Sequence, residues 1–157
     1  VNNADRGRAR VKGIRVDLQR YPGKARLIIP PLDLGGGLPR VADSAGMAAF
    51  KTWAKAHLRA VSANQRSRKK SDGEWARQRV ADVKAALAGG MAMELGAHDR
   101  SPTLGDIRLN PGEGRTLFLL LERPPRARAG QTYEVTVEQT DDAQPAVTAG
   151  VTIRVVT

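Results

Sequence analysis

The segment from Gln131 to Gln139 alternates strictly between apolar and polar side chains, and this pattern constrains the fold more than any other feature of the chain. Its apolar face consists of Tyr133, Val135 and Val137. Such alternation is typical of a β-strand with one buried face. A second alternating segment, 147–156, has as its inward-facing residues Val151, Ile153 and Val155. The C-terminal third, 106–157, therefore predicts consecutive antiparallel strands packed on a core.

Two further strand patterns lie near the N-terminus. Residues 11–18 alternate, with Ile14, Val16 and Leu18 on one side. A Pro-Gly turn leads to a second strand at 26–29, which Pro30-Pro31 follows directly. Because proline cannot donate a hydrogen bond to a neighbouring strand, we expect strand 26–29 to lie at a sheet edge or to stop there.

Two more strands follow in the C-terminal third. Residues 106–109 form a short strand before the turn at 110–113. The segment 115–121 is an almost continuous apolar run that contains four leucines and Phe118. A run of this kind is typical of a strand covered on both faces, so we expect 115–121 to be a central strand.

The hydrophobic period changes to that of a helix between residues 43 and 93. Asp43 or Ser44 is the expected N-cap of a first helix, whose apolar stripe is Met47, Phe50, Ala54, Leu58 and Val61. Ser71 and Glu74 have the spacing of a capping box, and the second stripe is Ala76, Val80, Val83, Leu87 and Met91. Gly89-Gly90 is the expected stop. Residues 41–95 thus predict a helical hairpin.

The order of signals in the strand regions resembles that of a known family. The turn Asn110–Glu113, the apolar strand 115–121, the Pro-rich loop 123–130 and the tyrosine-containing strand 131–139 resemble bacterial immunoglobulin-like repeats of the CARDB-like and fibronectin type III-like kind. The resemblance implies a mainly β, α+β domain: an immunoglobulin-like sandwich from 1–34 and 104–157 with the hairpin inserted. It also implies a tyrosine corner at Tyr133, and an ordinary half-buried aromatic fits the residue equally.

The resemblance leaves the sandwich short of strands before the hairpin. A complete first sheet then needs residues ahead of Val1, a strand donated by a partner, or an oligomer. The sequence starts at Val1, and both a processed N-terminus and a fragment start fit it.

The formal net charge of +10 favours anionic partners, although an arginine-rich composition on a solvated surface explains it as well. Most of the excess lies between Lys51 and Lys84, where ten basic and three acidic residues leave +7. The candidate partner-binding or anion-binding residues are Lys51, Lys55, Arg59, Arg66, Arg68, Lys69, Lys70, Arg77 and Arg79.

No pattern in the sequence predicts catalysis, a cofactor or a metal. His57 and His98 are the only histidines and have no ligand spacing, and cysteine is absent. Gly35-Gly36-Gly37 lacks the lysine and hydroxyl residue of a phosphate loop. Asp141-Asp142 is expected in a turn.

The leading hypothesis is a non-catalytic binding or assembly module of the cell envelope, the extracellular space or a multiprotein complex. Its partner would be another protein or an anionic surface polymer, contacted through the basic hairpin. The alternatives are a cytoplasmic protein that binds nucleic acid through the same hairpin, and an accessory domain of a larger exported enzyme. No segment predicts a membrane span.

Overall fold

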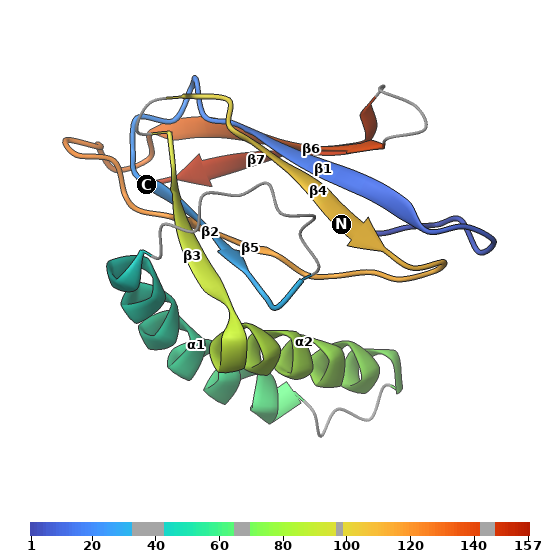
Figure 1. Ribbon diagram of the computed structural model, residues 1–157. Helices are drawn as coiled ribbons and strands as arrows, with labels where there is room; N and C mark the ends of the chain where they lie inside the picture. The colour runs from blue at the N-terminus through green and yellow to red at the C-terminus, as the bar shows by residue number, and fades with distance from the viewer. Residues whose placement is uncertain (33–42, 65–69, 97–98, 142–146) are drawn as a thin grey trace.

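The computed structural model describes residues 1–32, 43–64, 70–96, 99–141 and 147–157. They form two antiparallel sheets and two helices arranged in three layers (Figure 1). The three-stranded sheet is the middle layer, with the four-stranded sheet on one face and the helical pair on the other. The chain is therefore α+β, with a β-sandwich at its centre.

The four-stranded sheet has the order β4-β1-β6-β7. Its strands are β1 (Arg10–Asp17), β4 (Thr103–Leu109), β6 (Thr132–Asp141) and β7 (Val147–Val156). The three-stranded sheet has the order β3-β2-β5, from β3 (Met91–Leu95), β2 (Ala25–Ile29) and β5 (Phe118–Leu121). All five strand pairs are antiparallel. One edge of the sandwich is thus formed by β5 in one sheet and β7 in the other.

The main core lies between the two sheets. Its largest fully buried side chains include Leu18, Tyr21, Ile107 and Leu109. The faces predicted from alternation are confirmed for β1 and β6, since Ile14, Val16 and Val135 all point into this core. In β7 the predicted inward residues Val151 and Ile153 are exposed. Every residue of β2 is buried, because Leu27 faces the other sheet while Ile28 faces the helices.

The helices α1 (Ser44–Asn64) and α2 (Lys70–Gly89) cover the outer face of the three-stranded sheet. Asp43 is the N-cap of α1, because its Oδ1 accepts a hydrogen bond from the amide of Gly46 at 2.8 Å. The buried residues of this layer include Phe50 and Ala54 on α1, and Val83 and Ala86 on α2. The helical hairpin therefore packs on the three-stranded sheet and forms a second hydrophobic core with it.

The N-terminal residues are fixed between the sheets. Asn2 forms an isolated antiparallel bridge with Gly114. The buried amide of Asn3 donates to three carbonyl oxygens, those of Arg8, Leu109 and Asn110, at 2.8–3.3 Å. These bonds join the N-terminal segment to the end of β4 and the turn that follows it.

Strand 26–29 stops at the prolines, one of its two expected outcomes, and β2 is the centre of its sheet. Two other expectations about the strands were wrong. The run 115–121 contains β5, which is an edge strand and not a central one. The helices and the other sheet cover its two faces, but no strand among the described residues pairs with its outer side. Met91, assigned to the second helix, begins β3, a strand that the sequence analysis missed.

The tyrosine that ties the sandwich together is Tyr21. Its hydroxyl donates to the main-chain oxygen of Glu122, and its ring meets that of Tyr133 edge to face, with centroids 6.0 Å apart. Burial is the main cause that raises the pKa of the Tyr21 hydroxyl. Tyr133 itself is half-buried, and its hydroxyl has no hydrogen bond among the described residues. The half-buried interpretation of Tyr133 therefore agrees with the structure better than the tyrosine corner.

Candidate functional site

A stripe of cations runs along the outer side of α1. Lys51, Lys55 and Arg59 follow at intervals of four residues, so they lie on one face of the helix. All three side chains are exposed, whereas Phe50 and Ala54 on the opposite face are buried in the core. Helix α1 contains no acidic residue. This face therefore carries positive charge alone.

Helix α2 adds a second set of exposed cations. Arg77 and Lys84, seven residues apart, lie on one side of the helix, and both are exposed. Glu74 is the one exposed acidic residue among the described helical side chains. Asp82 is half-buried and accepts hydrogen bonds from Gln78 at 2.8 Å and from the hydroxyl of Thr116 at 2.7 Å. We call Lys51, Lys55, Arg59, Arg77 and Lys84 the basic face.

The structure describes only part of the predicted cationic set. Arg66, Arg68 and Lys69 lie outside the described residues, as does the side chain of Lys70 at the start of α2. Lys84 contributes to the charge of +7 between Lys51 and Lys84, but it is not one of the predicted partner-binding residues. Its spacing of seven residues from Arg77 was the signal that could have added it.

Seven cations of the sandwich have acidic partners, and the cations of the basic face have none within the described residues. The paired cations are Arg10 with Asp5, Lys12 with Asp141, Arg15 with Glu138, Arg20 and Arg154 with Glu134, Arg26 with Asp43 and Glu122, and Arg115 with Glu113. Exposed cations without an ion pair also occur outside the helices, for example Arg6, Arg8, Arg108 and Arg128. What distinguishes α1 is therefore the regular spacing of its cations and its lack of acidic residues.

Arg79, another of the predicted contacts, lies apart from the basic face. Its side chain is half-buried and turns toward the sheet, with the guanidinium carbon 5.2 Å from the centre of the Phe118 ring. Its Nε donates to Nε2 of His57 at 3.4 Å. Burial, and then the charge of Arg79, lower the pKa of His57. Arg79 is therefore part of a packed aromatic cluster.

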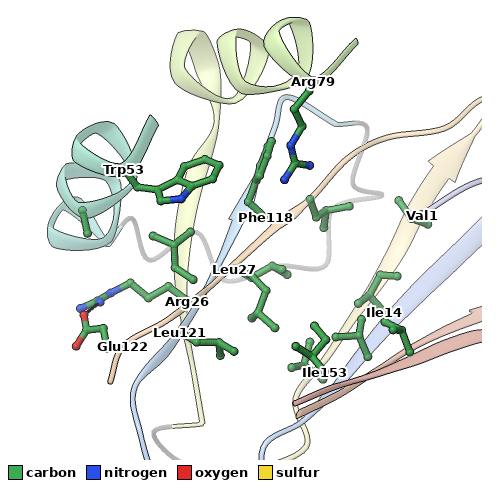
Figure 2. A pocket seen from close by; sticks show the side chains of 17 residues that line it. Val1, Ile14, Arg26, Leu27, Trp53, Arg79, Phe118, Leu121, Glu122 and Ile153 are labelled. Carbon is green, nitrogen blue, oxygen red and sulfur yellow. Dashed lines mark hydrogen bonds and ion pairs between the residues drawn. The ribbon is translucent and has the colours of Figure 1, made fainter. Parts of the chain in front are cut away.

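Trp53 is at the centre of this cluster. Its ring stacks on Phe50 with centroids 5.5 Å apart and on His57 with centroids 4.5 Å apart. Figure 2 shows Trp53, Phe118 and Arg79 on the helical side of the three-stranded sheet. Because Phe50 and His57 already stack on the ring of Trp53, it is poorly placed to stack on a nucleic-acid base, even though 36% of the residue is exposed.

A cleft with a volume of about 640 Å³ wraps around the outer edge of β5. On the sandwich side it is lined by apolar residues of both sheets: Ile14, Val16, Leu27, Leu119, Val137, Val151 and Ile153. On the helical side it reaches Trp53 and Arg79 (Figure 2). The volume lies within the range of about 300–1,000 Å³ for clefts that hold ligands.

Arg26 and Glu122 lie at the rim of the cleft. Arg26 is buried in the middle of β2, and its Nε donates to Oδ2 of Asp43 at 2.7 Å, while a second nitrogen donates to the carboxylate of Glu122. The amide of Gly46 and the Arg26 guanidinium lower the pKa of the Asp43 carboxyl. The charged pair is compensated, so we regard it as structural support.

The described residues contain no group of three or more His, Asp or Glu side chains placed to bind a metal. His57 packs in the aromatic cluster, while His98 and Asp142 lie outside the described residues. Asp141 pairs with Lys12 across β1 and β6.

Neither α1 nor α2, the helices of the described part, has the length and apolar character that a membrane crossing requires.

The cleft is the feature that sequence reasoning missed, because its lining comes from segments far apart in the chain. The one related prediction from the sequence was that the sandwich is short of strands before the helical hairpin. Comparison of the chain with protein-family models, with curated proteins and with solved structures found no match.

Proposed function

We propose that the protein is a non-catalytic binding or assembly module whose basic face contacts an acidic protein surface or an anionic surface polymer. The observation that carries this proposal is the stripe of exposed cations on α1, a helix without acidic residues, together with Arg77 and Lys84 on α2. None of these five cations forms an ion pair within the described residues. A cluster of one sign attracts a partner of the opposite sign and accelerates its association. An extracytoplasmic location is part of the same proposal.

We further propose that the scaffold is an immunoglobulin-like sandwich. In such domains strands C, F and G form one sheet, and strands B, E and D lie side by side in the other. The order β1-β6-β7 corresponds to C-F-G, and β2 beside β5 corresponds to D beside E. The segment Val1–Asn3, which pairs with the residues ahead of β5, corresponds to the end of strand B. Helices α1 and α2 with β3 and β4 are then an insertion between D and E.

The test of the basic face is the affinity of the purified protein for polyanions. The probes are heparin, polyglutamate, duplex DNA and single-stranded DNA, each measured at about 50 and about 200 mM salt. The helical variant carries Lys51→Gln, Lys55→Gln, Arg59→Gln and Arg77→Gln. The matched control makes the same change in net charge elsewhere, through Arg6→Gln, Arg8→Gln, Arg108→Gln and Arg128→Gln, all exposed residues without an ion pair among those described.

We expect heparin or polyglutamate to bind with a strong salt dependence. The helical variant should lose about 30-fold in affinity, because four exposed contacts at about 0.5 kcal/mol each sum to about 2 kcal/mol. The control variant should lose much less. Equal losses in both variants would mean that net charge alone drives binding. Tighter binding of DNA than of the other polyanions at the same salt would favour the nucleic-acid alternative.

A further inference from the structure

Exposed apolar side chains concentrate at the cleft beside β5. Among the described residues, four large apolar side chains are exposed: Trp53, Val151, Ile153 and Val156. The first three line the cleft, and Val151 is 55% exposed although it points toward the other sheet. Isolated exposed apolar residues are ordinary, but a contiguous group around a cleft marks a binding surface. This surface is separate from the basic face.

The backbone at the cleft is that of two open sheet edges. β5 ends one sheet and β7 ends the other, and no strand within the described residues pairs with the outer edge of either. The amide of Glu122 donates to the oxygen of Lys24 at 2.9 Å, on the β2 side. Because hydrogen-bonding direction alternates along a strand, the peptide groups of Leu119 and Leu121 point to the outer edge.

The chain already uses this edge just ahead of β5. The amide of Arg115 donates to the oxygen of Val1 at 2.8 Å, the terminal nitrogen of Val1 donates back to Arg115 at 3.0 Å, and Asn3 donates to Glu113 at 2.8 Å. These bonds form a short antiparallel ladder. Val1 also lines the cleft, so the ladder lies at one end of the cleft.

We infer that the cleft is a strand-binding site, which takes an extended segment of a partner polypeptide in trans. The bound segment runs antiparallel to β5 with its C-terminal end toward Val1, in the direction of Val1–Asn3. Its backbone pairs with Leu119 and Leu121, and every second side chain enters the apolar space between the sheets. In the proposed immunoglobulin-like correspondence, this is the position of strand B.

Two observations favour a polypeptide strand over a small apolar ligand. The outer peptide groups of β5 need hydrogen-bonding partners, which another backbone supplies and a hydrocarbon cannot. The cleft also has two sides, separated by the edge of β5. A strand has side chains on both faces, so one set meets Leu119, Val137 and Ile153 while the other meets Trp53 and Arg79.

The chemistry of the two sides defines the segment. The sandwich side is aliphatic, which suits valine, isoleucine or leucine at alternate positions. On the helical side the guanidinium of Arg79 lies over Phe118 and has no carboxylate partner among the described residues. An acidic or aromatic side chain on that face of the segment would complement it.

The experiment uses the whole chain and an acetylated, amidated peptide of about six residues in which Val and Thr alternate, with one Glu on the Thr face. A second peptide has the same composition with its Val residues consecutive. The protein variants are Val151→Lys, at the cleft, and Val156→Lys, a matched change on the same strand outside the cleft. Both positions are exposed, so both variants should fold.

We expect the alternating peptide to bind at least about tenfold more tightly than the rearranged peptide. Val151→Lys should weaken binding about tenfold, because it introduces a charge into the aliphatic side, and Val156→Lys should leave binding unchanged. On binding, the amides of Leu119 and Leu121 should become protected from hydrogen exchange. A nitroxide at the C-terminal end of the peptide should broaden the resonances of Thr116 and Leu117, and one at the N-terminal end those of Leu121 and Glu122.

A fused chain provides the positive control. When the alternating peptide is joined directly ahead of Val1, it should occupy the cleft within one molecule, so that free peptide no longer binds. Equal affinity for both peptides, protection of β7 amides in place of those of β5, or binding of decanoate without binding of either peptide would overturn the inference. None of these results depends on the basic face, so this test and the polyanion test fail independently.

Discussion

Arg26, in the middle of β2, donates from Nε to Oδ2 of Asp43 at 2.7 Å. This bond joins the central strand of the three-stranded sheet to the start of α1. The same carboxylate accepts a hydrogen bond from the amide of Gly46 at the start of the helix. One residue thus caps the helix and neutralises a buried cation. This link holds the helical layer, and with it the basic face, in place on the sandwich.

Replacing Asp43 should therefore destabilise the protein substantially. Asp43→Ala removes an N-cap, which costs about 1 kcal/mol, and leaves Arg26 with Glu122 alone, which costs about 1–2 kcal/mol more. We expect a loss of about 2–3 kcal/mol in the free energy of unfolding, measured by urea denaturation. Ser44→Ala is the control, because Ser44 is exposed and should change stability by about 0.5 kcal/mol or less. Similar losses in both variants would contradict the capping role of Asp43.

The two tyrosines should respond differently to loss of their hydroxyl groups. Tyr21→Phe leaves the main-chain oxygen of Glu122 without its donor in a partly buried setting, which should cost about 1–2 kcal/mol. Tyr133→Phe should cost about 0.5 kcal/mol or less, because the Tyr133 hydroxyl has no hydrogen bond among the described residues. Urea denaturation followed by tryptophan fluorescence measures both. A larger loss for Tyr133→Phe would restore the tyrosine-corner interpretation of that residue.

Protonation of His57 should weaken the fold at mildly acidic pH. Burial and Arg79 lower the pKa of His57 in the folded protein below the ordinary 6.5. As pH falls below about 6.5, the unfolded chain takes up a proton that the folded chain does not, so the free energy of unfolding decreases. The decrease should end once pH falls below the folded pKa. Denaturation curves between about pH 7.5 and 5 measure this effect.

The control for this effect is His57→Gln. The glutamine oxygen can still accept a hydrogen bond from Arg79, but the side chain does not titrate. The variant should show a smaller loss of stability over the same pH range. A fold that becomes more stable toward pH 5 in the wild-type protein, or identical pH dependence in the two proteins, would contradict the account.

Alternation and helical period predicted most of the elements because each is a local property. Strand neighbours are not local, and the sequence predicts them less well. Pro30 allowed either an edge or a stop for strand 26–29, and the strand stops there with both of its ladders intact. For β5 the prediction was wrong. The apolar run at β5 suggested a centre, because a strand between helices and a second sheet is covered on both faces even when one edge is open.

The candidate site was predictable only in part, for the same reason. The stripe of Lys51, Lys55 and Arg59 follows from spacing alone. Nothing in the sequence indicates that Arg79 turns onto Phe118, or that Met91 leaves the helix to begin β3. The cleft joins Val1, Trp53 and Val151, which are separated by about a third to the whole of the chain. Such proximity is a result of tertiary packing.

The most direct test of the central claim is a map of the residues that contact a polyanion. Amide and side-chain resonances of the labelled protein are followed while heparin oligosaccharides or polyglutamate are added at low salt. The account predicts shifts concentrated at Lys51, Lys55, Arg59, Arg77 and Lys84, with little change at the paired arginines of the sandwich. Shifts spread evenly over all exposed arginines and lysines, or centred on the outer face of the four-stranded sheet, would contradict it.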